Sequence, residues 1–306
     1  MKLASKKTEL DIGGRKLVVS NLEKILYPKT GFTKGQVIDY YIRVSKVLLP
    51  HLKNRPITLK RYPEGVEGFF FYEKQCPAHR PDWVKTTVVP SQRRQGKIDY
   101  CVMNDLPAVV WAANLADLEL HTFLHRAPAI TRPTMLAFDL DPGPPADIVL
   151  CCQVGLWLKA YFDKLGLECF PKTSGSKGLQ VFVPLNTPTT YEKTKPFAHA
   201  VAERVEREHP QSIVSRMQKS LRANKVLIDW SQNDDHKTTV SVYSLRAREH
   251  PTVSTPVTWK EVAQTLKAKD PTRLVFEAGQ VLERVDREGD LFEPVLRLKQ
   301  RLPASA

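Results

Sequence analysis

Two aspartates stand one residue apart at the end of an apolar run, in MLAFDLDPGP, residues 135–144. Residues two apart in a β-strand point to the same face, so Asp139 and Asp141 would lie side by side. The Pro-Gly-Pro break ends the strand and exposes the pair to solvent or a ligand. Because the two carboxylates repel, we expect either a proton on one of them or a hard divalent cation, Mg²⁺ or Mn²⁺, between them. Such a pair also occurs in solvated turns, and that alternative stays open.

A third aspartate, Asp229, ends the apolar run VLIDW in the same way. Three carboxylates on adjacent strands would hold two metal ions about 3.5–4 Å apart, as in enzymes that activate one oxygen and stabilise another around a phosphorus atom. The alternative is that Asp229 caps a turn into residues 231–233.

A glycine-rich turn, KTSGSKG (residues 172–178), lies between two further apolar runs. Its glycines permit tight turns, and its serines and lysines supply hydroxyls and charge, which together suit a phosphate cradle. The pattern is not a Walker A loop, and an ordinary hairpin turn is the alternative. His121 and Arg246 are weaker candidates, since a hydrogen-bonded core histidine and a surface cation would explain them equally.

Hydrophobic periodicity predicts the elements that hold these residues, and their mixture favours an α+β fold. The first half predicts a hairpin with Gly13-Gly14 as its turn, a helix that begins at Lys34 and ends before Pro50, and short strands. It also predicts a helix over residues 106–120 that leads to His121. The second half predicts strands at 135–141, 167–172, 179–185 and 226–230, with helices at about 146–165 and 191–208.

Composition indicates the kind of partner rather than the fold. A chain of 306 residues is one large domain or two packed subdomains. Its 46 Lys and Arg against 33 Asp and Glu leave a formal charge of +13, which suits a phosphate-rich polymer, although a basic protein without such a partner is the alternative.

Two further expectations concern the compartment. The start MKLASKKTEL lacks the apolar core of a signal peptide, and no apolar run reaches about 18 residues, so we expect a cytoplasmic protein with no membrane partner. The five cysteines form no CxxC pair, so we expect reduced core thiols rather than a zinc site or a disulfide framework.

The segments FDLDPGP, KTSGSKGLQVFVPL, VLIDWSQN and YSLRAR, in this order and spacing, resemble the polymerase domain of bacterial ligase D, a member of the archaeo-eukaryotic primase superfamily. The segments NLEKILYP, TGFTKGQVIDYY, RPITLKRYP and FYEKQCPAHRPDW resemble the same family. The resemblance implies a primase-like catalytic core of mixed and antiparallel sheets with flanking helices. It implies a single catalytic domain, residues 1–306, with an N-terminal lobe of about 1–105 and a metal-binding lobe of about 106–300.

The resemblance also implies a function. It indicates a template-dependent nucleotidyltransferase that uses NTP or dNTP, prefers ribonucleotides, and fills gaps and extends ends in non-homologous end joining with two Mn²⁺ or Mg²⁺ ions. Its partners would be gapped, nicked or broken DNA with a 5′-phosphate, a Ku-type end-binding protein and a DNA ligase activity, on the nucleoid. A primase that starts strands without a primer and a catalytically inactive DNA-end-binding module are the alternatives.

The resemblance further implies residue roles. Asp139, Asp141 and Asp229 would bind the metals, and His121 would act beside them in catalysis. The nucleotide pocket would contain Ser174, Lys177, Arg246, Lys60 and, as a weaker candidate, Gln232. The DNA contacts would be Lys24 and Lys34 at the 5′-phosphate with Asn21 as a helper, Phe71 and Tyr72 at the template bases, and Arg93, Arg94, Lys219 and Arg222 in loops at the opposing end.

Overall fold

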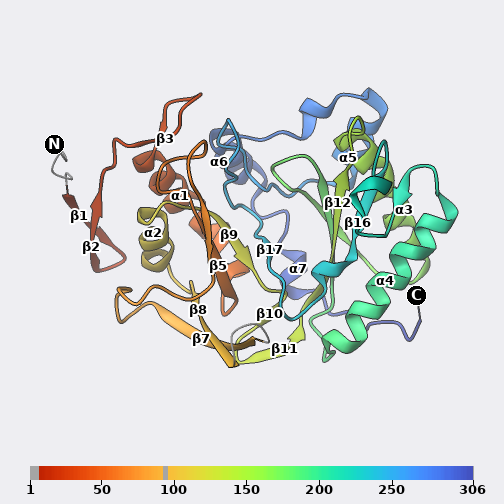
Figure 1. The fold of residues 1–306 in the computed structure, drawn as a ribbon, viewed down its shortest axis with the longest axis horizontal. Coiled ribbons are helices and arrows are strands. Elements are labelled where there is room, and N and C mark those ends of the chain that lie inside the picture. The colour runs from red at the N-terminus through yellow and green to blue at the C-terminus, as the bar shows by residue number, and fades with distance from the viewer. Residues whose placement is uncertain (1–6, 92–95, 306) are drawn as a thin grey trace.

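Two β-sheets, each flanked by helices, form the frame of the protein in this computed structural model, which describes residues 7–91 and 96–305 (Figure 1). Most strand pairs are antiparallel, and the α+β expectation is confirmed. The first sheet has the order β17-β9-β5-β8-β7, and β6 also pairs with β5. Its strands are β5 (Pro56–Arg61), β6 (Phe71–Glu73), β7 (Lys85–Ser91), β8 (Gly96–Val102), β9 (Asp117–Thr122) and β17 (Thr239–Val240).

The second sheet carries the aspartates and has the order β13-β14-β12-β16-β15. Its central strand, β12, pairs antiparallel with β14 on one side and β16 on the other, and only β15 runs parallel to its neighbour among the pairs described. The bounds are β12 (Met135–Pro142), β13 (Phe170–Thr173), β14 (Leu179–Pro184), β15 (Ile213–Val214) and β16 (Val226–Asp229).

Three small two-stranded ribbons complete the strands. The hairpin predicted around Gly13-Gly14 is confirmed, with both glycines at positive φ. The ribbons are β1 (Lys7–Ile12) with β2 (Arg15–Ser20), β3 (Ile25–Tyr27) with β4 (Phe32–Thr33), and β10 (His125–Arg126) with β11 (Ala129–Pro133).

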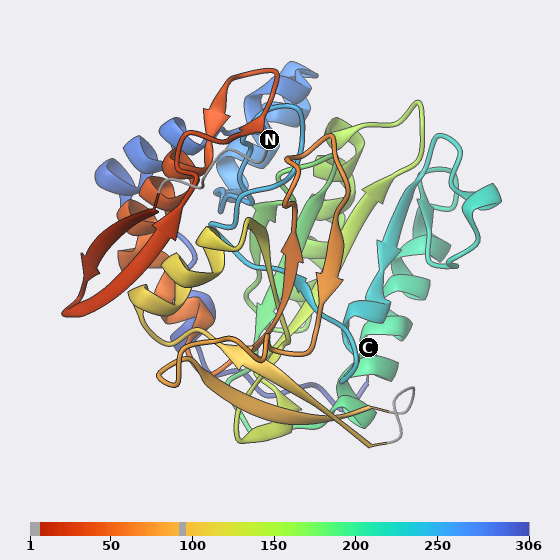
Figure 2. The ribbon, with the colours of Figure 1, turned by 60° about the vertical axis from the view of Figure 1, so that its left-hand side comes forward.

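The helices cover the outer faces of the sheets, and the apolar side chains on one face of each long helix pack against a hydrophobic core. Helix α1 packs on α2, whereas α3 packs on β12 and β14. In both ribbon views the second sheet and its helices lie away from the N-terminal hairpin (Figures 1 and 2). The helices are α1 (Lys34–Leu52), α2 (Leu106–Asn114), α3 (Ile148–Lys164), α4 (Tyr191–Glu208), α5 (Trp259–Ala268), α6 (Ala278–Glu288) and α7 (Pro294–Arg297), with 3₁₀ turns η1 (Lys219–Leu221), η2 (Trp230–Gln232) and η3 (Pro271–Leu274).

Helix α1 shows why its start was predictable and its end was not. Thr33 and Gln36 form a reciprocal capping box, a strong local start signal. The expectation that Pro50 lies beyond the helix is wrong, because α1 continues through it to Leu52. A proline costs one backbone hydrogen bond there. The buried side chains of Val47, Leu48 and Leu52 hold this last turn against the core despite that loss.

The helix predicted over residues 106–120 is also wrong in its second half. Helix α2 ends at Asn114, Ala116 takes a left-handed conformation, and the chain continues as strand β9. This apolar segment is buried on every side, so its pattern has no period that separates a helix from a strand. The consequence is functional, since His121 lies on a central strand rather than after a helix.

The expectation of five reduced cysteines is wrong for two of them. Cys76 and Cys101 form a disulfide, with their Cα atoms 4.9 Å apart. The segment after β6 runs along β8, where the Cys76 amide donates to the Asp99 carbonyl at 2.7 Å, and this pairing of distant segments is invisible in sequence spacing. The other three, Cys151, Cys152 and Cys169, are free and buried.

Within residues 7–91 and 96–305, none of the helices combines the length and the apolar character that crossing a membrane requires.

Candidate active site

Strand pairing brings the three aspartates together. Asp139 on β12 lies directly opposite Asp229 on β16, so their side chains are cross-strand neighbours. Asp141 lies two residues further along β12, on the same face, and is exposed at the strand end. The three side chains offer carboxylate oxygens, which are ligands that hard divalent cations prefer, so their chemistry fits such a cation.

The electrostatics of Asp139 support this fit. Burial, and then the negative charges of Asp229 and Asp141, raise its pKa to about 6. Asp141 is partly compensated by Arg222, whose guanidinium lies 3.3 Å from its carboxylate. A site that holds an excess of negative charge in this way favours a bound cation.

Asp229 also caps a turn, as the alternative reading expected. Its Oδ1 accepts hydrogen bonds from the amide and hydroxyl of Ser231, and its Oδ2 accepts one from Gln232. These bonds hold the carboxylate in place at the end of β16. Capping and a place beside Asp139 are therefore compatible.

The glycine-rich turn lies against the same strand. Ser174 Oγ accepts hydrogen bonds from the amides of Ser176 and Gly178, which closes the turn. A Cβ at Gly178 would lie 2.0 Å from the carbonyl oxygen of Leu140 on β12, so only glycine lets the turn approach this closely. The turn and the aspartates are neighbours for that reason.

A cavity of about 320 Å³ lies between the aspartates and this turn. Most of the side chains predicted for catalysis and nucleotide binding line it. Lys60 and Asp229 lie next to its lining, through Glu119 and Asp139 respectively. The predicted residues in the lining are Tyr72, His121, Asp139, Asp141, Ser174, Lys177, Gln232 and Arg246.

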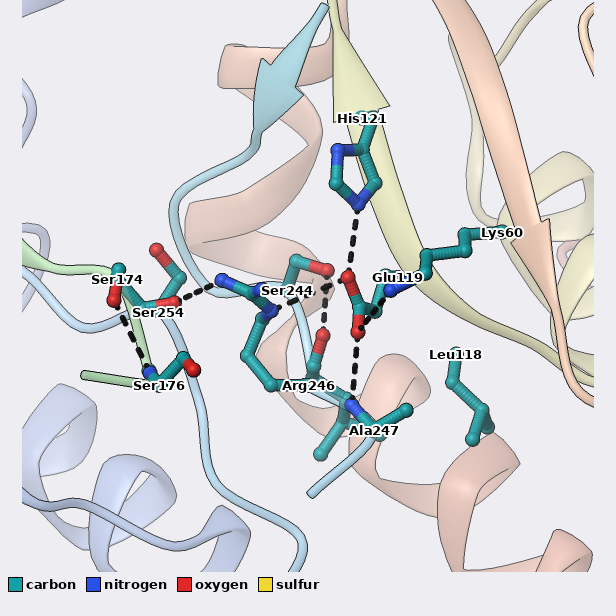
Figure 3. Close-up of polar contacts among 12 residues, drawn as sticks. Lys60, Leu118, Glu119, His121, Ser174, Ser176, Ser244, Arg246, Ala247 and Ser254 are labelled. Atoms are coloured by element: carbon teal, nitrogen blue, oxygen red, sulfur yellow. Dashed lines mark hydrogen bonds and ion pairs between the residues drawn. The ribbon is translucent and has the colours of Figure 1, made fainter. Parts of the chain in front are cut away.

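Glu119, which sequence reasoning passed over, lies among three basic side chains of this site, those of Lys60, His121 and Arg246 (Figure 3). The carboxylate oxygens of Glu119 lie 3.2 Å from Lys60 Nζ, 2.9 Å from His121 Nε2 and 3.2 Å from Arg246 Nε. Burial alone would raise the pKa of Glu119, but the hydrogen bond with His121 and the nearby positive charges hold it well below its usual range. The signal for it was the Glu-x-His spacing on a strand, which places both side chains on one face.

Burial and neighbouring groups also determine the surroundings of the basic side chains at Glu119. Burial lowers the pKa of His121 and outweighs the opposite influence of Glu119. The Lys60 ammonium lies about 5 Å from each of three ring centres, those of Tyr62, Phe70 and Tyr72. It is therefore held between an aromatic cage and a carboxylate.

Lys172 corrects one detail of the predicted cradle. Its side chain is fully buried instead of lining the turn, and it donates to Gln180 Oε1 and to Ser254 Oγ. Burial lowers its pKa well below the usual value. Lys177, in contrast, is exposed in the turn.

The two lysines predicted at the 5′-phosphate lie together at the start of α1. The amide of Lys34 donates to the carbonyl of Lys24 at 2.8 Å, and Asn21, at positive φ, accepts from the Lys24 amide. Lys34 Nζ donates to the Ser20 carbonyl. Burial, and then the charges of Lys24 and Arg61, lower the pKa of Lys34 to about 8.

The predicted aromatic pair belongs to a larger exposed group on and before β6. Tyr72 is 56% exposed, and Phe69 and Phe70, which sequence reasoning did not select, are 68% and 46% exposed. The ring of Phe71 stacks on that of Phe69. Together they present a surface suited to base stacking.

The remaining basic candidates are dispersed. Lys219 is exposed on η1, whereas Arg222 turns toward Asp141 and also donates to the Met217 carbonyl, so it lies closer to the aspartates than predicted. Arg93 and Arg94 lie outside the described residues.

A second acidic group, Asp234, Asp235 and His236, lies nearby with ligand atoms within 4.8 Å of one another. Asp234 already forms an ion pair with Lys195 at 2.5 Å, and the other two are exposed. Nothing beyond their proximity points to an ion there.

The chain is similar to known proteins in sequence and in fold. Residues 33–292 match the family model described as LigD, primase-polymerase domain. The multifunctional non-homologous end joining protein LigD of Mycolicibacterium smegmatis is 39% identical over 283 residues, which is 90% of this chain and 36% of that protein. The bifunctional LigD of Bacillus subtilis is 33% identical over 95% of this chain and 46% of its own length.

A solved structure shows the same fold. The polymerase domain of Mycobacterium tuberculosis ligase D in complex with DNA is similar with a TM-score of 0.85 and 38% identity, covering 92% of this chain and 98% of that one. The chain thus spans less than half of the length of the curated relatives above but nearly all of a solved polymerase domain.

Proposed function

The chain belongs to the LigD primase-polymerase family, and from this premise we propose that it is a template-dependent nucleotidyltransferase that fills gaps and extends ends in double-strand break repair by non-homologous end joining. The observation that carries the proposal is the cavity in which Asp139 and Asp141, with Asp229 paired to Asp139, lie opposite a glycine-rich turn and basic side chains. Phosphoryl transfer requires positioning and charge neutralisation rather than a covalent nucleophile, and this cavity supplies both.

We assign the metal-binding role to Asp139, Asp141 and Asp229. These residues would hold two divalent ions, Mg²⁺ or Mn²⁺, whose charge would activate the primer 3′-hydroxyl and neutralise the triphosphate and the leaving pyrophosphate. The proximity of Asp139 to Asp229 and its raised pKa support the assignment.

The nucleotide, NTP or dNTP, would bind on the other side of the cavity. Amides and hydroxyls of the turn at Ser174, with Lys177 and Arg246, would hold the triphosphate, while His121 acts beside the reacting groups. Lys60 would hold the nucleotide from its aromatic cage, and Gln232, whose amide already holds Asp229, would be a weaker contact. A preference for ribonucleotides is part of the proposal through the family resemblance.

The DNA would lie across the face that carries the basic and aromatic groups. Lys24 and Lys34, with Asn21, would hold the downstream 5′-phosphate at the start of α1, where the helix dipole also favours an anion. Phe71 and Tyr72 would stack on the template bases, and Lys219, Arg222, Arg93 and Arg94 would contact the opposing end. By family, a Ku-type end-binding protein and a DNA ligase activity would be partners on the nucleoid.

We further propose that residues 1–306 act as one catalytic domain with two packed lobes, about 1–105 and about 106–300. The two largest hydrophobic clusters of the described residues support two packed lobes, but the first also contains residues after 105, such as Leu118 and Tyr243, so the lobes interlock in sequence. Calorimetric unfolding in one transition would agree with a single cooperative unit, and two separated transitions would contradict it.

The test is a gap-filling assay with Mn²⁺ or Mg²⁺. It uses ribonucleotides and deoxyribonucleotides on gapped duplexes with and without a downstream 5′-phosphate. We expect template-dependent extension that is stronger with the phosphate. Substantial product on a single-stranded template without primer would instead indicate a primase.

Asp139→Ala provides the matched control. It should nearly abolish extension while DNA binding remains, because affinity comes mainly from contacts with backbone phosphates. Binding by the wild-type protein without extension under any metal would favour a DNA-end-binding module and reject the enzyme proposal.

A further inference from the structure

Glu119 is buried among the cations of the nucleotide pocket, yet the proposed reaction gives it no role. We propose that Glu119 is a positioning residue: it orients Lys60, His121 and Arg246 for the phosphates of the incoming nucleotide. This inference rests on the proposed function, because it assumes that the cavity binds a nucleoside triphosphate.

The two carboxylate oxygens divide the surrounding groups between them. Oε1 accepts from Lys60 Nζ at 3.2 Å, the Ala247 amide at 3.1 Å and the Tyr62 hydroxyl at 3.4 Å. Oε2 faces His121 Nε2 at 2.9 Å and Arg246 Nε at 3.2 Å (Figure 3). One side chain therefore connects β5, β9 and the segment after β17.

The carboxylate itself is held rigidly. Glu119 is the cross-strand neighbour of Lys60, and His121 lies two residues along β9 on the same face. The Ala247 amide, a backbone group, fixes the orientation of Oε1. The strand pairing and the Ala247 amide therefore fix the place of Glu119, against which the neighbouring basic side chains are oriented.

Each cation gains a defined direction from this contact. Arg246 forms an ion pair with Glu119 through Nε and donates a hydrogen bond to the Ser174 carbonyl through an outer guanidinium nitrogen, so it bridges the carboxylate and the glycine-rich turn. His121 uses Nε2, which in the neutral ring places the proton there and makes Nδ1 an acceptor. His121 lines the cavity, and its ring packs edge-to-face with that of Tyr72, with the ring centres 5.9 Å apart.

Position and charge indicate that Glu119 supports the cations rather than competing with phosphate. His121 and Arg246 line the cavity, whereas Glu119 lies behind them and is not part of the lining formed by the described residues. Lys60 and Arg246 place two positive charges beside the same carboxylate, so the two side chains repel one another. Without the carboxylate, the cations would turn apart toward solvent.

Glu119→Gln tests the proposal because it keeps the size of the side chain and removes its charge. The amide nitrogen of the new glutamine cannot accept a hydrogen bond from His121 or form an ion pair with Arg246. The basic side chains therefore lose the contact that orients them. We expect the KM for the nucleotide to rise roughly 10- to 100-fold, with a smaller change in kcat and an unchanged KM for DNA. A purely structural role would lower the amount of folded enzyme without moving the nucleotide KM.

Asp290→Asn is the matched control for loss of a buried carboxylate. Asp290 also accepts from a buried histidine, His51, at 2.9 Å and from the Tyr243 hydroxyl at 2.7 Å, outside the lining of the nucleotide cavity. We expect this variant to lower the unfolding midpoint and leave the nucleotide KM unchanged. An equal rise of the nucleotide KM in both variants would overturn the proposal.

Direct binding of a nucleoside triphosphate to wild type and Glu119→Gln separates the possible failures. Equal binding by the two proteins would reject the role of Glu119. Tighter binding by the variant would also reject it, because the carboxylate would then compete with phosphate. Binding by wild type without incorporation would reject the proposed function while still testing Glu119. Absence of binding by wild type would reject both.

Discussion

At the scale of single residues, the site places groups of opposite charge around one small cavity. The aspartates leave an excess of negative charge on one side of the cavity, as the raised pKa of Asp139 shows. Glu119 and the cations around it balance the other side. Metal ions would complement the negative side of the cavity, and a triphosphate would complement the positive side.

Lys34 gives a pH-dependent prediction for the proposed 5′-phosphate contact. Its pKa is lowered to about 8, so the ammonium is charged at pH 7 and becomes a neutral amine as the pH rises through and beyond 8. Bound phosphate raises that pKa, so the midpoint should lie above 8. Since hydrogen bonds to charged groups contribute about 1.5–3 kcal/mol, the preference for 5′-phosphorylated gaps should fall at least about tenfold by pH 9.5, measured by fluorescence anisotropy.

Two variants control this measurement. Lys34→Arg stays charged throughout this range and should remove the pH dependence, while Lys53→Ala, at an exposed lysine just past the other end of α1, should leave it unchanged. The double variant Lys24→Ala and Lys34→Ala should weaken binding only when the phosphate is present. An equal loss on dephosphorylated gaps would disprove the assignment.

At the scale of elements, the antiparallel pairing of β12 with β14 and β16 decides which residues meet. The register sets Asp139 between Gln180 and Asp229, and the turn before β14 approaches Leu140 through Gly178. A shift of one residue in either pairing would move these side chains to the opposite face. The site therefore depends on strand register more than on loop conformation.

Gly178→Ala tests this dependence. The added Cβ would lie 2.0 Å from the Leu140 carbonyl oxygen, so the turn must move away from β12. We expect a loss of about 1–3 kcal/mol in the free energy of unfolding, measured in urea, together with weaker nucleotide binding. Gly279→Ala in α6, where a Cβ meets nothing within 4 Å, should be neutral or stabilising, and equal stability of the two variants would contradict the argument.

At the scale of the whole molecule, the formal charge of +13 is the property that bears on DNA. Each neutralised phosphate releases counterions, so binding weakens as salt rises. Contacts from Lys24, Lys34, Lys219 and Arg222 would correspond to about four phosphates and to a loss of roughly 100-fold in affinity between 50 and 200 mM salt.

Lys219→Ala checks the source of that salt dependence. This exposed lysine on η1 should account for about one unit of the slope of log affinity against log salt, without any change in sequence preference. Titrations at several salt concentrations measure the slope. An unchanged slope would remove Lys219 from the DNA contacts.

The sequence by itself determined the features that are written locally. Apolar periodicity and caps predicted most strands and helices, and the aspartates at the strand ends, the glycine-rich turn and the family resemblance predicted where the site would form. Local patterns have no information on which distant segments meet, and a segment buried on every side has no period, which is why the helix over 106–120 was wrong after Asn114.

Only the tertiary structure decided which residues that are remote in the sequence contact one another. It joined Cys76 to Cys101, buried Lys172 away from the turn, and brought Arg222 to Asp141. It also placed Glu119 against the Ala247 amide, 128 residues away in the chain. These contacts arise because sheet pairing and core packing bring remote residues together, and a buried charge keeps its ionised form only where such packing supplies an opposite charge.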